Sequence, residues 1–216
     1  KPVESRCNLD CGYFYCLSKG RLVQGLGAGR MADEALEMLV QQYIGSVTGD
    51  EVAIFWQGGE PLLLGLEFFR KAVALEQKYA KPEQRIESDL QTNGTLLDEE
   101  WCESLKQHRF LMVLSIDGPK ETHDHHRVTK GGRPTSEQVF AGAKLLHRHS
   151  LPSICSHVCI ASIGGTPKMC ISFCDRNSAR DTSSSSPTWS TKISSSWCLR
   201  LGIVENCRYA GLVACG

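Results

Sequence analysis

Three thiols stand close together near the start of the chain, at Cys7, Cys11 and Cys16. A cubane iron-sulfur cluster needs thiolates from a tight loop that can wrap one of its corners. The chain holds 11 cysteines, an odd number that leaves at least one unpaired in any disulfide framework. This distribution favours metal or iron-sulfur ligation in a reducing compartment over a secreted disulfide scaffold.

Three later segments combine glycine with polar residues suited to ligand binding. Residues 56–61 contain two adjacent glycines, which let a backbone approach a ligand closely and leave amides and carbonyls free. Residues 91–94 end in Asn-Gly, and residues 115–118 end in Asp-Gly. Each segment by itself is more typical of a turn than of a binding site. Whether the three segments form one binding site depends on the strands and helices that position them.

Hydrophobic periodicity predicts those elements. Apolar residues recur at helical spacing over residues 32–44, with Asp33 and Glu34 in the first turn, where negative charge is favourable. Similar patterns predict strands at 51–56, 85–90 and 110–116 and helices at 66–79, 98–107 and 136–149. Strands that alternate with such helices form parallel βαβ units, whose functional loops lie at the carboxyl ends of the strands. We therefore predict an α/β fold, a partial barrel in which one ligand contacts all three glycine-containing segments.

The cysteine loop and the three segments, followed by His123, Asp124 and Arg127, resemble in order and spacing the radical S-adenosylmethionine (SAM) enzymes of the anaerobic sulfatase-maturase family. The resemblance covers roughly residues 3–150. It implies a partial (β/α) barrel of the radical SAM type, a [4Fe-4S] cluster held by three cysteines, and S-adenosylmethionine bound at the open iron. In this family a 5′-deoxyadenosyl radical abstracts hydrogen from Cβ of a Cys or Ser of a sulfatase, which becomes formylglycine.

The resemblance also implies roles for single residues. Tyr13 corresponds to the aromatic residue on the adenine side, and Gly59 to the contact with the methionine ammonium group. Ser115 corresponds to a hydroxyl that contacts ribose or carboxylate, and Arg127 to the guanidinium that pairs with the carboxylate, a role that suits its bidentate geometry. The full set of implied cofactor-binding residues is Tyr13, Gly58, Gly59, Glu60, Gln91, Asn93, Ser115 and Arg127.

The cysteine loop departs from the family at one position. The family spacing is Cys-x3-Cys-x2-Cys, and Cys7 and Cys11 match it, but Phe14 stands at the third position and a cysteine follows at Cys16. Phenylalanine cannot ligate iron. We predict Cys7, Cys11 and Cys16 as the metal ligands. Three explanations stay open: a rearranged loop brings Cys16 to the cluster, the loop holds no stable cluster, or the sequence is in error here.

Other residues of ligand-forming type have simpler explanations. His123, His125 and His126 lie in a polar segment without a carboxylate framework, so we predict surface residues rather than a metal site. Cys102 lies on a helical pattern and is predicted to be a small buried hydrophobe.

The chain changes character near residue 151. Residues 151–216 are rich in Ser and Cys and show no periodicity, so we predict an irregular or disordered tail with no domain assigned, after a radical SAM core over residues 1–150. The family would continue here with further strands and helices and with auxiliary clusters. Under permitted codon choices, residues 151–187 can be reread in a shifted frame as a strand–helix–strand sequence resembling that continuation, and we hypothesise a frameshift near Leu151.

A frameshift has a direct consequence for the assignment of residues. The general base and the auxiliary ligands would be encoded in the lost frame, so the catalytic residue stays unknown. The four-residue spacings within Cys155/Cys159 and Cys170/Cys174 are then neither auxiliary ligands nor a zinc site. The same holds for the remaining cysteines of the tail, Cys198, Cys207 and Cys215.

Charge and length limit the partners. Lys+Arg and Asp+Glu number 24 each, so no basic field favours nucleic acid or an acidic membrane. No stretch approaches the roughly 20 apolar residues of a membrane span. We expect a cytoplasmic oxidoreductase, impaired in this chain, that acts on a sulfatase polypeptide with S-adenosylmethionine and a reducing electron donor. Two alternatives stay open: a truncated non-catalytic remnant that at most binds S-adenosylmethionine, and a radical SAM enzyme that modifies another peptide.

Overall fold

Helices and parallel strands alternate along most of the chain. The computed structural model describes residues 2–3, 5–13, 30–117, 120–163, 166–175 and 208–214. The alternating elements are α2 (Asp33–Ser46), β2 (Glu51–Trp56), α3 (Leu66–Tyr79), β3 (Arg85–Thr92), α4 (Glu99–Gln107), β4 (Leu111–Ser115), α6 (Ser136–Arg148) and β6 (Ser153–Ile163). The predicted helices and strands all occur, with ends that differ by no more than two residues.

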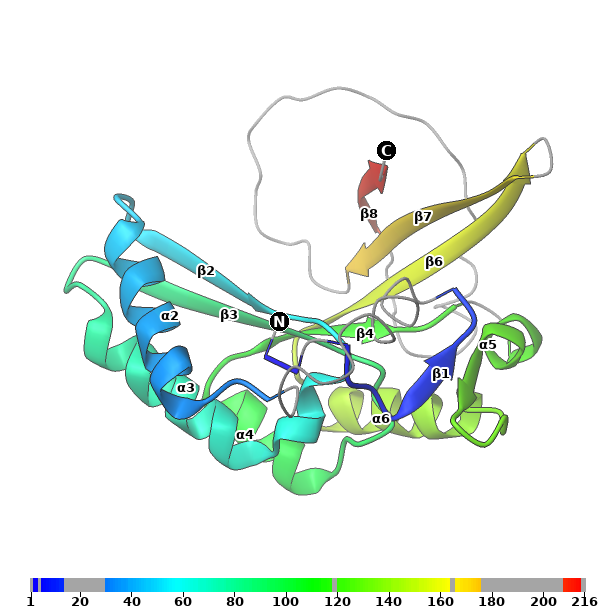
Figure 1. The fold of residues 1–216 in the computed structure, drawn as a ribbon, viewed down its shortest axis with the longest axis horizontal. Helices are drawn as coiled ribbons and strands as arrows, with labels where there is room; N and C mark the ends of the chain where they lie inside the picture. The colour runs from blue at the N-terminus through cyan, green and yellow to red at the C-terminus, as the bar shows by residue number, and fades with distance from the viewer. Residues whose placement is uncertain are drawn as a thin grey trace.

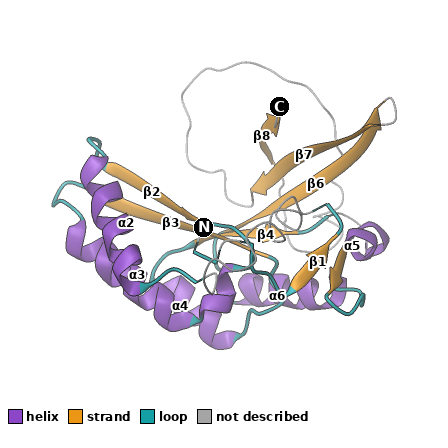
Figure 2. Ribbon diagram, viewed as in Figure 1, coloured by secondary structure: helices purple, strands orange, loops and turns teal. Residues whose placement is uncertain are grey.

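The larger of the two described sheets is twisted and has the strand order β2-β3-β4-β6-β7-β8. The first four strands are parallel, and β7 (Thr166–Asp175) and β8 (Arg208–Ala214) continue the sheet in antiparallel pairing. Helices α2, α3, α4 and α6 lie on one side of the parallel strands, as Figures 1 and 2 show. The predicted α/β partial barrel is therefore confirmed.

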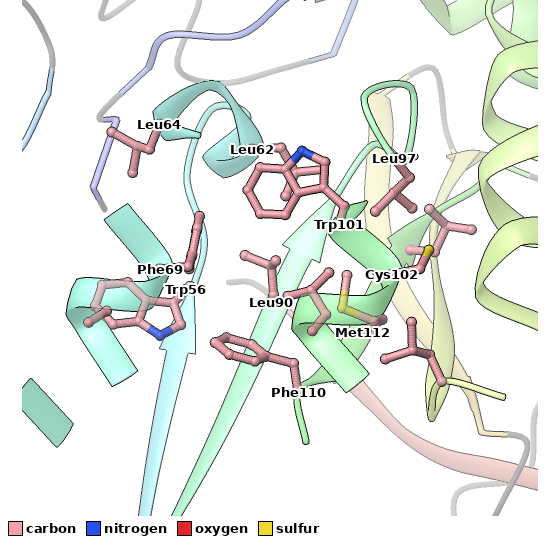
Figure 3. Packing of buried hydrophobic residues seen from close by; sticks show 14 of the residues in the cluster. Trp56, Leu62, Leu64, Phe69, Leu90, Leu97, Trp101, Cys102, Phe110 and Met112 are labelled. Carbon is pink, nitrogen blue, oxygen red and sulfur yellow. The ribbon is translucent and has the colours of Figure 1, made fainter. Parts of the chain in front are cut away.

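Aromatic and aliphatic side chains fill the layer between these helices and the sheet (Figure 3). The ring of Phe69 on α3 packs edge-on against Trp56, Phe68, Trp101 and Phe110, with centroids 5.3–6.1 Å apart. Such edge-to-face contacts add to the free energy gained from burying the rings. On the same layer Cys102 is fully buried, as predicted. The core thus fixes the carboxyl ends of β2, β3 and β4 relative to one another.

Four short elements were not predicted: β1 (Leu9–Cys11), the 3-10 helix η1 (Pro61–Leu64), α5 (Lys120–His126) and β5 (Arg127–Thr129). Strands β1 and β5 pair in antiparallel register, with Cys11 opposite Arg127. The pairing of β1 with β5 places the cysteine loop, which includes Cys11, next to Arg127. Within the described ranges, the helices are too short or too polar to span a bilayer.

The described residues beyond 151 form strands where an irregular tail was expected. The first four residues of β6, 153–156, pair in parallel with β4, from Met112↔Ser153 to Ser115↔Ser156, and β7 and β8 extend the sheet. Pairing with the edge of β4 satisfies backbone hydrogen bonds without requiring an alternating side-chain pattern. This explains why periodicity gave no signal there. Cys198, Cys207 and Cys215 lie outside the described residues.

Candidate functional site

The three glycine-containing segments meet at one edge of the sheet, as predicted. Glu60, after β2, accepts hydrogen bonds from residues at the end of β3, and Gln91 on β3 reaches Ser115 on β4, with 3.5 Å between Nε2 and Oγ. The parallel register of β2, β3 and β4 produces this meeting, because it places all three carboxyl ends side by side. Gln91 and Ser115 belong to the predicted site.

Glu60 is fully buried and joins the ends of β2 and β3. Its Oε1 accepts hydrogen bonds from Thr92 Oγ1 at 2.8 Å and from the Leu62 amide at 3.0 Å, and its Oε2 accepts one from the Asn93 amide at 2.8 Å. Burial raises the pKa of Glu60 to about 7, although these donors and Arg127 act to lower it. Both oxygens are thus directed to protein donors, and Glu60 holds the loop that was predicted to bind the cofactor.

The adjacent glycines turn the chain against the residues before Cys7. Gly58 and Gly59 have φ of 107° and 55°, values that favour glycine. A Cβ on Gly59 would lie 2.0 Å from the carbonyl oxygen of Arg6, and that oxygen accepts a 2.8 Å hydrogen bond from the Glu60 amide. The missing side chain of Gly59 therefore makes room for the cysteine loop.

The first two predicted metal ligands lie close to this junction. Cys7 Sγ accepts hydrogen bonds from the Leu9 amide at 3.4 Å and from Asn93 Nδ2 at 3.8 Å. Burial raises the pKa of Cys7 above its usual value and that of Cys11 to about 11, while the positive charge of Arg127 acts to lower both. Phe14 and Cys16 lie outside the described residues, and the described part of the chain contains no cluster of three or more His, Cys, Asp or Glu side chains arranged to hold a metal ion.

Asn93 holds the cysteine loop to the end of β3 through a small polar network. Its Nδ2 donates to Asn8 Oδ1 at 2.9 Å, Asn8 Nδ2 donates to Thr95 Oγ1 at 2.8 Å, and Thr95 Oγ1 donates to Asn93 Oδ1 at 2.7 Å. The three side chains form a closed ring of hydrogen bonds. In the structure, Asn93, which was predicted as a cofactor contact, thus holds the segment that contains Cys7.

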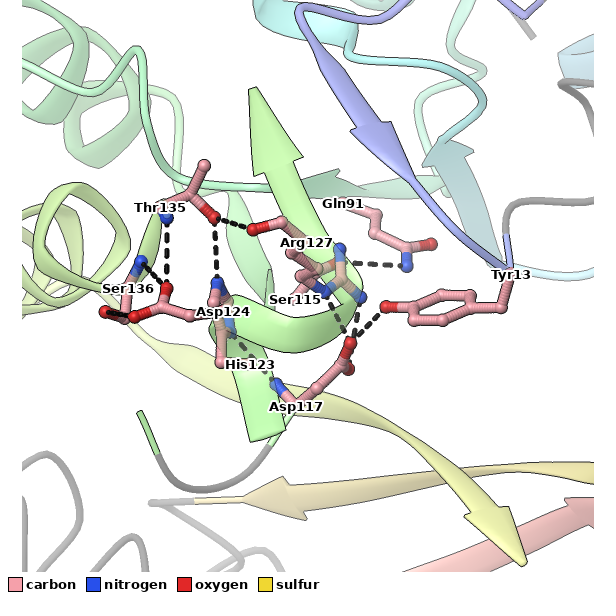
Figure 4. Close-up of polar contacts among 9 residues, drawn as sticks. All are labelled: Tyr13, Gln91, Ser115, Asp117, His123, Asp124, Arg127, Thr135 and Ser136. Carbon is pink, nitrogen blue, oxygen red and sulfur yellow. Dashed lines mark hydrogen bonds and ion pairs between the residues drawn. The ribbon is translucent and has the colours of Figure 1, made fainter. Parts of the chain in front are cut away.

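Arg127 pairs with a carboxylate of the chain itself. Its Nε donates to Asp117 Oδ2 at 2.7 Å and its Nη2 donates to Asp117 Oδ1 at 3.2 Å (Figure 4). The Tyr13 hydroxyl donates to the same Asp117 oxygen, and the guanidinium carbon lies 5.4 Å from the centre of the Tyr13 ring. Burial acts to lower the pKa of Arg127, but the carboxylate of Asp117 raises it above its usual value.

Asp117 was not among the predicted site residues, although it lies in the segment 115–118. The sequence did hold a signal for it: a carboxylate directly after a strand end and ten residues before Arg127, the predicted cation of the site. Burial raises the pKa of Tyr13 far above its usual value, and Asp117 contributes through its charge and its hydrogen bond. Tyr13, Asp117 and Arg127 thus form one hydrogen-bonded group, an ion pair with a neutral phenol bound to its carboxylate.

The prediction of surface histidines was wrong for His123. It is fully buried in α5, because both ring nitrogens have partners: Nδ1 accepts the Asp117 amide at 3.3 Å, and Nε2 lies 3.2 Å from Thr135 Oγ1. Burial and the nearby Arg127 lower the pKa of His123 to about 4, so the ring is neutral. His125 is exposed and His126 is partly exposed.

Residues 3–176 match the family described as the Radical SAM superfamily. The chain is 43% identical over 151 residues to a serine-type anaerobic sulfatase-maturating enzyme of Bacteroides thetaiotaomicron, covering 70% of this chain and 36% of that protein. It is 40% identical over 153 residues to a cysteine-type anaerobic sulfatase-maturating enzyme of Clostridium perfringens, covering 70% of this chain and 40% of that protein.

Solved structures give the same result. A structure described as native anSMEcpe with bound AdoMet has a TM-score of 0.65 at 39% identity, covering 72% of this chain and 42% of that one. Another, with bound AdoMet and the Cp18Cys peptide, has a TM-score of 0.65 at 37% identity, covering 72% and 40%. These matches confirm the predicted resemblance. The chain spans about two fifths of the length of the relatives named here.

Proposed function

Because the chain belongs to the radical SAM superfamily, we propose that it binds S-adenosylmethionine beside a [4Fe-4S] cluster at the carboxyl ends of β2, β3 and β4. We further propose that its substrate is a sulfatase polypeptide, in which a Cys or Ser becomes formylglycine with electrons from a reducing donor. One observation carries the proposal: the β1–β5 pair sets Cys11 opposite Arg127, so a cluster ligand and a carboxylate-binding cation lie together.

The described residues suit a thiolate-bound cluster at two ligand positions. Cys7 Sγ accepts two N–H groups, from Leu9 and Asn93, and such donors stabilise a thiolate. The positive charge of Arg127 favours the thiolate form of both Cys7 and Cys11. Cys16 is the proposed third ligand.

When bound, the cluster and S-adenosylmethionine supply one-electron cleavage of the sulfonium and, through it, hydrogen abstraction from the substrate. The chain's own residues bind and orient. We assign Arg127 to the ligand carboxylate, Ser115 to the ribose or the carboxylate, and Tyr13 to the adenine side. The segment containing Gly58 and Gly59 is assigned to the ammonium group. The burial of Ser115 and Arg127 keeps water from these polar contacts.

Anaerobic reconstitution tests the proposal. The expected result is about four irons per chain, a cluster absorption band, and 5′-deoxyadenosine on reduction. Cys11→Ala should abolish all three readouts, whereas Cys102→Ala, which removes a buried thiol on α4 away from the site, should preserve them. Wild-type protein that stays colourless and yields no 5′-deoxyadenosine would contradict the proposal.

Phe14 favours one alternative, a non-catalytic remnant that at most binds S-adenosylmethionine. The variant Phe14→Cys restores the family spacing and separates the two cases. If the loop is the only defect, Phe14→Cys gains the cluster that the wild-type chain lacks. If wild-type protein already holds a cluster through Cys16, the variant brings no gain in iron.

The division of the chain at residue 150 is also part of the proposal. We propose a radical SAM core over residues 1–150, followed by a segment translated out of the ancestral frame. Genomic resequencing around codons 14 and 151 tests this idea. Codons incompatible with the shifted reading would overturn it, and a restored frame would encode the missing family continuation.

A further inference from the structure

The ion pair between Asp117 and Arg127 is nearly closed off from solvent. The side chains are 1% and 9% exposed, and they come from different elements, the loop after β4 and the start of β5. A buried charge is stable only with a partner, so Asp117 gives Arg127 the counter-ion that a ligand would otherwise have to provide. Figure 4 shows the pair beside Ser115, Gln91 and Tyr13.

The pair uses only one edge of the guanidinium. An arginine offers two edges that can each bind a carboxylate with two N–H groups: Nε with Nη2, and Nη1 with Nη2. Asp117 takes the edge formed by Nε and Nη2. Within the described residues, no hydrogen bond reaches Nη1 of Arg127. The second edge is therefore available to another carboxylate.

The orientation of the pair is fixed from both sides. The Tyr13 hydroxyl donates to the Asp117 carboxylate, and the Asp117 amide donates to His123 Nδ1 at 3.3 Å. His123 Nε2 contacts Thr135 Oγ1, which donates to the backbone carbonyl of Arg127 at 2.7 Å. A chain of hydrogen bonds thus connects the backbone of Asp117 to the backbone of Arg127. Groups fixed in this way lose little freedom when a ligand binds.

We propose that Asp117 is a positioning residue: it holds Arg127 by one edge so that the other edge meets the carboxylate of the bound ligand. The inference rests on the proposed function, in which that ligand is S-adenosylmethionine. A purely structural counter-ion would support all ligands equally. A positioning residue supports only those that carry the carboxylate.

Two ligands separate these roles, S-adenosylmethionine and its decarboxylated analogue. Their affinities are measured by calorimetry on the reconstituted full chain without reductant. Because charge-assisted hydrogen bonds contribute about 1.5–3 kcal/mol, wild type should prefer the carboxylate form about 10- to 150-fold. Asp117→Asn should lower this preference about tenfold or more relative to wild type, while leaving the affinity for the analogue nearly unchanged. In the wild-type chain the Asp124 carboxylate caps α6 and does not contact Arg127, so the control variant Asp124→Asn should keep the wild-type preference.

Asp117→Glu keeps the negative charge but displaces the carboxylate oxygens. This second variant keeps the test valid if Asp117→Asn does not fold. We expect it to fold like wild type and still lose most of the preference. An equal loss for both ligands, or an undiminished preference in either variant, would overturn the inference and leave the proposed function intact. Wild-type protein that binds neither ligand would instead contradict the proposed function, and the inference with it.

Discussion

Replacing Gly59 by alanine tests how tightly the glycine turn meets the cysteine loop. A Cβ at this position would lie 2.0 Å from the carbonyl oxygen of Arg6 and 2.8 Å from its carbonyl carbon. The oxygen would have to move by about 1 Å to reach the shortest spacing that real Cβ atoms show. The atom that must move belongs to the backbone next to Cys7, so no side-chain rotation can relieve the contact.

The cost of Gly59→Ala has three parts. A left-handed backbone costs a non-glycine residue about 1–2 kcal/mol, and overpacking against Arg6 adds about 1–3 kcal/mol. Loss of the hydrogen bond from the Glu60 amide to Arg6 adds about 1 kcal/mol. We expect the free energy of unfolding to fall by about 4 kcal/mol. Gly132→Ala is the matched control, because Gly132 also has a positive φ, 74°, but has no atom within 4 Å of its Cβ position. Its expected loss is only the backbone cost of about 1–2 kcal/mol.

Urea unfolding followed by tryptophan fluorescence measures both variants, since Trp56 and Trp101 are buried in the core beside the site. The reconstituted Gly59→Ala protein should also hold less iron than Gly132→Ala, because the displaced backbone leads directly to Cys7. Equal losses of stability in the two variants would refute the argument. They would show that the chain before Cys7 moves aside freely and that the close approach does not constrain the cysteine loop.

Three further predictions concern other parts of the structure. Burial raises the pKa of Glu76 to about 7, so its protonated form stabilises the fold below pH 4.5. As the pH rises to 7 this contribution is lost, and the free energy of unfolding should fall by at most about 3 kcal/mol. Glu76→Gln should flatten this dependence in urea unfolding, and an unchanged slope would contradict it. Asp124 Oδ1 accepts hydrogen bonds from the amides of Thr135 at 3.0 Å and Ser136 at 2.8 Å, where α6 begins. Asp124→Ala should lower the free energy of unfolding by about 1–2 kcal/mol and speed hydrogen exchange at these two amides. Unchanged exchange would argue against this cap. Asn93→Ala removes an N–H···S bond to Cys7, the proposed cluster ligand. It should lower the reduction potential of the reconstituted cluster in an EPR-monitored titration, because such bonds stabilise the more negative reduced state. An unaltered potential would count against the contact.

The sequence predicted the long elements well because their signals are local. The helix at 99–107 begins where Asp98 caps it, accepting a 2.9 Å hydrogen bond from the Trp101 amide, and this kind of cap is visible in the sequence. Strands β1 and β5 have only three residues each, and their stability comes from pairing with each other across more than a hundred residues of sequence. No periodicity can develop over three residues, so their pairing could only be seen in three dimensions.

The site shows the same division between position and partner. The predicted strand order was enough to place Ser115 and Gln91 at one edge of the sheet. It could not predict which carboxylate Arg127 binds, because a guanidinium can donate equally well to a carboxylate of the chain or of a ligand.

His123 illustrates the limit most clearly. A histidine in a polar segment is normally exposed, and burying it requires partners for both ring nitrogens. The Thr135 hydroxyl has one hydrogen, which it donates to the Arg127 carbonyl, so His123 Nε2 must donate to Thr135 and Nδ1 must accept from the Asp117 amide. One neutral tautomer of His123 therefore gives partners to the Asp117 amide, both ring nitrogens and the Thr135 hydroxyl. That requirement joins α5 to the loop after β4, to β5 and to the start of α6, and it follows only from their assembly in the fold.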